Sequence, residues 1–294
     1  MSPQLSMTGT LKGGILLLAL LVTVALLAFG YQPTEPHLNS IPLSHYLDKQ
    51  TYGELRTERD ARESIRDFGT NAVPYLIRIL EARESKLKTT FRELAQKQTL
   101  IRFRFTPLFA RQSQAALACA ELGPVAASAS PALARLANDP LLCRHAITAL
   151  AMIGPENFQV LTNALLTGIP AARAEAAGDL RYMFPRDLPV PALLHALNDP
   201  DAEVRSNAAG SLAFLHCQLN VVVPSLITCL RDTDATVRGT VAQSLGWLQQ
   251  DAVSALPALS QLLREAPDAA SEVKITEAIR SIETAAAHQG ELSK

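Results

Sequence analysis

The sequence is poor in aromatic residues and carries almost no net charge. Aromatic side chains make up 5% of its 294 residues, whereas hydrophobic residues reach 48%. This composition is typical of a mostly helical protein, because the Ala and Leu that dominate it are strong helix formers. The formal net charge of −1 argues against a partner bound by bulk charge, and so against nucleic acid.

Cysteine is scarce, and its spacing fits no metal site. The chain has no C-x-x-C pair, and no two cysteines lie at zinc-ligand spacing with a histidine. The motifs HExxH, GxSxG, the P-loop and GxGxxG are also missing. We therefore expect no catalytic residue, no metal and no cofactor, and we infer no small-molecule substrate. An enzyme whose site assembles from distant parts of the chain stays open as an alternative.

One long apolar run stands near the N-terminus. Residues 11–31 hold no charge after Lys12, and the next acid is Glu35. About 20 apolar residues cross a bilayer, so we expect a signal anchor that places the protein in the membrane as a single-pass chain. Lys12 favours an extracytoplasmic position for the rest of the chain. The alternative is export after cleavage of a signal peptide. Residues 1–10 form a short tail, and residues 32–57 form a linker with a possible short helix at 40–49.

The remaining chain repeats itself about every 32 residues. The phrase "VRSNAAGSLAFLH" at Val204 returns as "VRGTVAQSLGWLQ" at Val237. With the arginine as position zero, apolar or small residues fall at +3, +4, +7, +8 and +10, which is one face of a helix. The same template fits with zero at Gln112, Cys143, Arg173, Arg205, Arg238 and Glu272, after an earlier copy that begins at Glu58.

A second helix follows each first one, and a proline usually opens it. Proline suits the first helical turn because the amide there has no partner in any case. The copy at Arg173 departs from the template: Arg181 stands at +8, where other copies have Ala or Gly, and Pro185 follows. We expect that copy to be irregular.

The repeated pattern resembles that of a known protein family. The pattern D-x-x-V-R-x-x-A-A-x-x-L, followed by V-P-x-L-x-x-x-L, resembles bacterial HEAT repeats, including the HEAT-like repeats of phycobilisome lyases, and covers residues 58–284. It implies an all-α fold, an α-solenoid of about seven HEAT-like helix pairs after the N-terminal transmembrane or signal helix, with a polar tail at 285–294. For function it implies a scaffold or adaptor that binds another protein; the alternative is an enzyme resembling phycobilin lyases.

The repeated arginine has a structural interpretation. Arg205 and Arg238 start their helices beside acidic turns, and an arginine–carboxylate pair is well suited to hold one repeat against the next. We expect Asp201 and Asp234 to supply the carboxylates. A ladder of arginines offered to an acidic partner is the other interpretation.

The first departure from the repeat is a basic insert, residues 83–111. It holds eight basic and two acidic residues, and its aromatic residues alternate with arginines. The insert is either a solvated helix and loop or a docking site for an acidic protein, an anionic membrane surface or single-stranded nucleic acid. The candidate partner-binding residues are Arg92, Lys97, Arg102, Phe103, Arg104 and Phe105.

The second departure is at position +9. Four successive copies place Met152, Tyr182, Phe214 and Trp247 there. On a helical wheel this position points away from the apolar face. These side chains therefore either form an outer contact stripe, with Tyr182, Phe214 and Trp247 as candidates for partner binding, or turn inward and cover the junctions between repeats.

Overall fold

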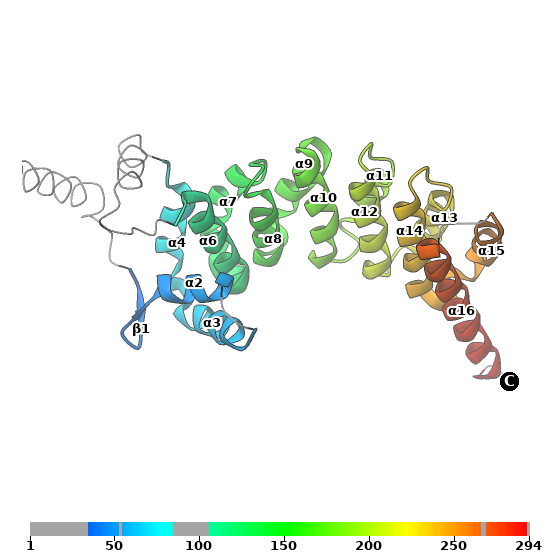
Figure 1. The fold of residues 1–294 in the computed structure, drawn as a ribbon, viewed down its shortest axis with the longest axis horizontal. Helices are drawn as coiled ribbons and strands as arrows, with labels where there is room; N and C mark the ends of the chain where they lie inside the picture. The colour runs from blue at the N-terminus through cyan, green and yellow to red at the C-terminus, as the bar shows by residue number, and fades with distance from the viewer. Residues whose placement is uncertain (1–34, 53–54, 85–105, 266–268, 293–294) are drawn as a thin grey trace, which may run out of the picture. The chain divides into compact units, whose positions relative to one another are not determined.

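A computed structural model describes residues 35–52, 55–84, 106–265 and 269–292 (Figure 1). These residues are almost entirely helical, as the sequence predicts. The chain divides into two compact units, Met1–Arg111 and Gln112–Lys294. The apolar run at 11–31 lies outside the described residues, so the expected anchor stays a prediction.

The N-terminal unit begins with a small hairpin rather than an open linker. Strand β1 (His37–Leu38) pairs antiparallel with β2 (Ile41–Pro42). The helices that follow are α2 (Leu43–Tyr52), α3 (Leu55–Phe68) and, after a 3-10 turn at Gly69–Asn71, α4 (Val73–Glu81). Leu43 and Leu47 of α2 are buried. The expected linker, residues 32–57 with a possible short helix at 40–49, thus contains a hairpin and the helix α2, whose apolar side chains have a surface to cover.

The C-terminal unit is a row of helix pairs. Its first helices follow the template of the sequence, and its second helices run back beside them. The first helices are α6 (Leu108–Leu122), α8 (Cys143–Ile153), α10 (Pro170–Asp179), α12 (Ala202–Leu215), α14 (Ala235–Leu248) and α16 (Ala269–Leu292). The second helices are α7 (Ser130–Leu136), α9 (Phe158–Thr167), α11 (Val190–Ala196), α13 (Leu219–Cys229) and α15 (Leu256–Arg264). Short 3-10 turns lie at Gly123–Ala129, Pro155–Asn157, Leu180–Tyr182 and Gln249–Ala255.

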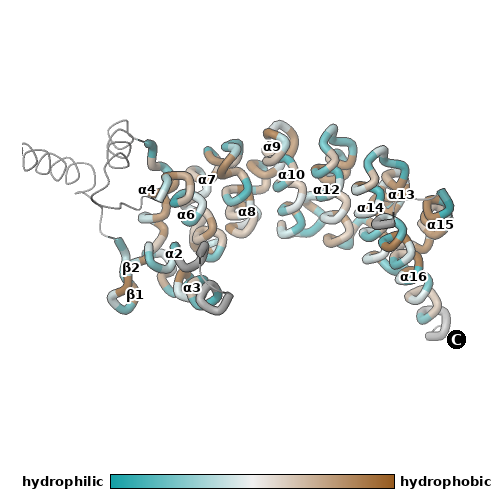
Figure 2. Tube along the Cα trace, in the orientation of Figure 1, coloured by the Kyte–Doolittle hydropathy of each residue, from teal (hydrophilic) through white to brown (hydrophobic). Residues whose placement is uncertain are grey.

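The first helices form the more closely packed layer of this unit. Each contacts the next along the row α8, α10, α12, α14 and α16 (Figure 1). Small residues allow this approach: the hydroxyl of Ser211 donates to the Ala177 carbonyl oxygen at 2.7 Å, and that of Ser281 donates to the Gly246 carbonyl oxygen at 3.0 Å. Leucine, isoleucine and valine fill the space between the two layers, and α13 is apolar along most of its length (Figure 2). Stacking therefore buries faces that a single pair would expose.

The repeat at Arg173 is irregular, as its sequence predicts. Helix α10 ends at Asp179, and a 3-10 turn carries Leu180–Tyr182. Two other boundaries differ from expectation. Helix α13 starts at Leu219 and holds Pro224 inside it, because apolar residues before the proline also pack. Helix α16 continues to Leu292, so most of the expected polar tail is helical.

One described segment, Leu108–Leu136, is long and apolar enough to cross a membrane by length and composition. It comprises α6, a 3-10 turn and α7 rather than one straight helix. Its most apolar window is 44% buried within the structure. The apolar side chains of this segment thus serve the packing of a repeat.

Two glycines on neighbouring first helices give a matched test of this packing. A Cβ atom added to Gly246 would lie 2.9 Å from the Cα of Ala278, whereas one added to Gly210 meets nothing within 4 Å. We expect Gly246→Ala to destabilise the protein by about 1–3 kcal/mol through overpacking. Gly210→Ala should stabilise it by about 0.5–1 kcal/mol, because alanine is the better helix former. Urea unfolding of both variants measures this, and equal shifts would contradict the close approach of α14 and α16.

Candidate interaction surface

Two arginines at position zero link successive repeats. Nε and Nη2 of Arg205 donate to the two carboxylate oxygens of Asp232, at 2.7 and 2.8 Å. Arg173 pairs with Asp199 in the same two-pronged way, at 2.9 Å for each bond. Because Asp199 and Asp232 lie in the turns before α12 and α14, each pair joins one repeat to the following one.

The same turns bind the arginine of their own repeat through the main chain. Nη1 of Arg205 donates to the Asp199 carbonyl oxygen at 2.8 Å, and Nη1 of Arg238 donates to that of Asp232 at 2.9 Å. Each aspartate thus accepts from two repeats. We call this series, from Arg173 through Asp199, Arg205 and Asp232 to Arg238, the arginine–aspartate relay.

The carboxyl groups of the relay titrate below their ordinary range. Burial acts to raise the pKa of Asp232, but hydrogen bonds from Arg205 and from the Asp234 amide outweigh it and lower that pKa. The pKa of Asp199 is lowered in the same way, against burial, by Arg173 and by the Asp201 amide. Both groups are therefore carboxylates at neutral pH, as the pairing requires.

The partners expected for the repeated arginine need correction. The side chains of Asp201 and Asp234 cap helices α12 and α14, where each accepts from two amides of the first turn. An N-cap carboxylate points toward those free amides, so the inter-repeat carboxylate of Arg205 is Asp232, two residues before the cap. The doublet D-x-D in each turn was the signal: its first aspartate binds arginine and its second caps the helix.

The +9 side chains lie on the exposed face of the first helices. Their exposed fractions are 38% for Met152, 46% for Tyr182, 50% for Phe214 and 55% for Trp247. The rings of Tyr182 and Phe214 meet edge to face, with centroids 6.1 Å apart, so they span the junction of two repeats while half exposed. We call these four residues the outer stripe.

One residue beside the outer stripe escaped the sequence analysis as a functional candidate. Arg181 places its guanidinium carbon 5.1 Å from the Tyr182 ring centroid and 5.9 Å from that of Phe214. The sequence signal for it was present, because Arg181 breaks the small-residue rule at +8. The sequence pattern alone indicates only that this repeat is irregular.

The candidates of the basic insert (Arg92, Lys97, Arg102, Phe103, Arg104 and Phe105) lie outside the described residues. Their role in binding stays a prediction.

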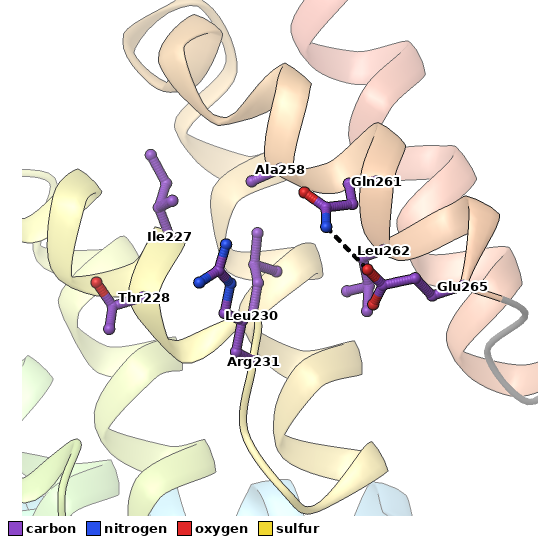
Figure 3. A pocket seen from close by; sticks show the side chains of 8 residues that line it. All are labelled: Ile227, Thr228, Leu230, Arg231, Ala258, Gln261, Leu262 and Glu265. Carbon is purple, nitrogen blue, oxygen red and sulfur yellow. Dashed lines mark hydrogen bonds between the residues drawn. The ribbon is translucent and has the colours of Figure 1, made fainter.

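The described residues contain no group of three or more metal-ligating side chains. Burial raises the pKa of the Cys119 thiol to about 12, which suppresses its thiolate. A cavity of about 180 Å³ between α13 and α15 offers Arg231, Gln261 and Glu265 but neither cysteine nor histidine (Figure 3). Gln261 donates to Glu265 within it at 2.9 Å.

Removing the charge of Asp232 should weaken the stack of repeats. We expect Asp232→Asn to lower the free energy of unfolding by about 1–2 kcal/mol, because Arg205 is left paired to a neutral group in a largely buried position. The control is Asp251→Asn, whose partner His216 and carboxylate are both well exposed and should matter little. Urea unfolding at neutral pH measures both.

The difference between Asp232→Asn and the parent protein should also depend on pH. A carboxyl group with a lowered folded pKa stabilises the protein above its unfolded pKa, and this contribution is lost as the pH falls through the folded value. The two stabilities should converge below about pH 4. A difference that stays constant down to pH 2 would contradict the pairing.

Trp247 is the single tryptophan of the chain, so its fluorescence reports the outer stripe directly. With about half of its surface exposed, it should emit at long wavelength and be quenched by acrylamide nearly as well as free N-acetyl-tryptophanamide. A short-wavelength, quench-resistant emission would mean that the ring is covered.

Comparison with known proteins identifies the repeats. Residues 190–280 match the family model of HEAT repeats, and no match is found among curated protein sequences. Similar solved structures include the CpcE–CpcF complex of phycocyanin lyase from Nostoc sp., at 20% identity over 86% of this chain and 97% of that chain, with a TM-score of 0.41.

Two further solved structures resemble the chain. A designed armadillo repeat protein covers 71% of this chain and 99% of its own at 15% identity, with a TM-score of 0.42. Human deoxyhypusine hydroxylase in complex with glycerol covers 91% and 90% at 17% identity, with a TM-score of 0.37. The residues matched by the family model run from α11 into α16, so this part of the C-terminal unit consists of HEAT repeats.

Proposed function

We propose that this protein is a non-catalytic scaffold that binds another protein through the outer stripe. One observation carries this proposal: four consecutive repeats place a large, partly exposed side chain at +9, a position that the packing of helix pairs does not require. Tyrosine, tryptophan and arginine are the residues that most often dominate binding energy at protein interfaces. All three occur here, at Tyr182, Trp247 and Arg181.

The first-helix layer suits such a use because its surface is pre-formed. Small side chains lie beside the large ones, and Gly210 faces open space. A partner that covers the outer stripe would bury its rings without unfolding a repeat, so little ordering cost opposes binding.

We further propose that residues 11–31 anchor this surface to a membrane. The support is the length of the uncharged run, which matches a bilayer, and the placement of Lys12 before it. The solenoid would then lie outside the cytoplasm on a single-pass chain. Cleavage of the run as a signal peptide would instead export the solenoid.

Photo-crosslinking in the native cells tests the binding surface. A p-benzoylphenylalanine in place of Phe214 or Trp247 should give one discrete adduct, identified by mass spectrometry. The matched controls replace Leu166 and Val221, which are exposed on the second helices, and should give none. Adducts of equal yield at the controls, or none at the stripe, would refute the proposal.

Substitutions then distinguish binding through the outer stripe from binding through the basic insert. The double change Phe214→Ser with Trp247→Ser should lower the affinity for the captured partner at least tenfold. This loss should depend little on salt, because it is a loss of apolar contact. Charge reversal at Arg102 and Arg104 should have no such effect if the stripe is the binding surface. A salt-sensitive loss with the charge reversals alone would assign binding to the insert.

A further inference from the structure

Arg181 stands where every neighbouring repeat needs a small residue. The +8 positions of α8, α12 and α14 hold Ala151, Ala213 and Gly246, and all three are buried. In the copy at Arg173 the helix stops before this position, and the 3-10 turn at Leu180–Tyr182 carries Arg181 to the surface. The irregularity of this repeat thus presents a guanidinium beside the outer stripe.

The guanidinium of Arg181 is held in place by rings rather than by a carboxylate. It faces both Tyr182 and Phe214 at cation–π distances. Its Nε is buried and has no hydrogen-bond partner within the described part of the chain. The guanidinium, an array of N–H donors, thereby lies at the edge of an apolar surface, with one buried donor that no described residue satisfies.

Other arginines of the first-helix layer already form ion pairs. Arg173 and Arg205 bind aspartates in the arginine–aspartate relay, and Arg144 pairs with Glu175 at 2.7 Å. The carboxylate nearest to Arg181 in sequence is Asp179, which is buried and accepts from the Thr148 hydroxyl at 2.7 Å. It acts on Arg181 only at longer range, since no ion pair joins them among the described residues. Arg238 has no close carboxylate among the described residues either, but its Nη1 donates to the carbonyl oxygens of Asp232 and Thr233. Arg181 differs from these arginines in that its buried Nε has no hydrogen-bond partner among the described residues.

The guanidinium of Arg181 and the exposed rings beside it together favour a partner segment of one chemical type. A guanidinium that lies against two rings and has no ion-pair partner among the described residues favours a carboxylate, which it can bind with two hydrogen bonds. The half-exposed rings on either side favour apolar side chains next to that carboxylate. An isolated acidic residue in a polar segment would leave the rings uncovered, and a purely apolar segment would leave Arg181 unpaired at a buried edge.

The spacing of the repeats adds a geometric condition. Packed helices lie about 8–10 Å apart, and an extended polyproline II segment rises about 3.1 Å per residue with three residues per turn. Side chains three residues apart in such a segment would therefore meet adjacent repeats from the same side. The guanidinium of Arg181 lies beside both rings, 5.1 Å from the Tyr182 centroid and 5.9 Å from that of Phe214. A carboxylate that pairs with it therefore belongs, along the segment, between the two apolar residues that cover these rings.

We propose that the outer stripe binds an extended segment of a partner protein in which an aspartate or glutamate, paired with Arg181, lies between two apolar residues three positions apart. This inference rests on the proposed function and names the ligand chemistry of the same surface.

Selection from a displayed library of random peptides tests the proposal without assuming a sequence. The full chain, purified in mild detergent, should enrich peptides with an acid between two apolar residues three positions apart. Selection on Arg181→Gln should lose the acid and retain the apolar residues. The matched control is Arg144→Gln, an exposed arginine of the same layer with its own carboxylate, which should enrich the same peptides as the parent protein.

Binding measurements on one enriched peptide complete the test. Arg181→Gln and the peptide's acid-to-amide change should each weaken binding by roughly three- to tenfold, as expected for a partly exposed charge pair. The two changes together should cost no more than one alone, because they remove the same interaction. Circular dichroism and thermal unfolding of Arg181→Gln verify that the repeat is still folded.

Three results would overturn the proposal. These are the recovery of no binding peptide, enrichment without the acid, and an acid preference that survives Arg181→Gln. If crosslinks at Phe214 and Trp247 still identify a partner in any of these cases, the scaffold function stands and only the acidic ligand is wrong.

Discussion

The arginine–aspartate relay is the interaction on which the rest of the C-terminal unit depends. A helix pair has no independent core, so its position must be set by its neighbours. Apolar packing supplies most of the attraction but tolerates sliding, whereas a two-pronged arginine–carboxylate bond fixes both distance and orientation. By also accepting from the next arginine through its carbonyl oxygen, Asp232 aligns the ends of α12, α13 and α14 at one point.

The positions that stay exposed in this arrangement are the candidates for binding a partner. Position +9 is exposed in four successive repeats, at Met152, Tyr182, Phe214 and Trp247, so these side chains are free to vary. The break in the repeat at Arg173 then places a guanidinium beside two rings of the outer stripe. The regular part of the structure sets the spacing, and the irregular part supplies the distinctive chemistry.

Much of the fold could be predicted from periodicity. The spacing of small and apolar residues identified the first helices, and proline marked the start of most second helices. Boundaries were less certain where packing rather than a local signal decides: α13 begins before Pro224, and α16 extends to Leu292. In the N-terminal unit the segment 35–52 is folded because its few apolar side chains find cover, which a short window of sequence does not reveal.

The candidate site was likewise predictable only in part. The sequence by itself determined that the chain repeats, that an arginine opens each of two nearly identical helices, and that +9 carries large side chains, because these are patterns along one chain. Tertiary structure alone decided that Arg205 binds Asp232 rather than Asp201, and that Arg181 contacts the ring of Phe214. These contacts join residues 27 and 33 positions apart, and their partners are chosen by how one helix packs on the next.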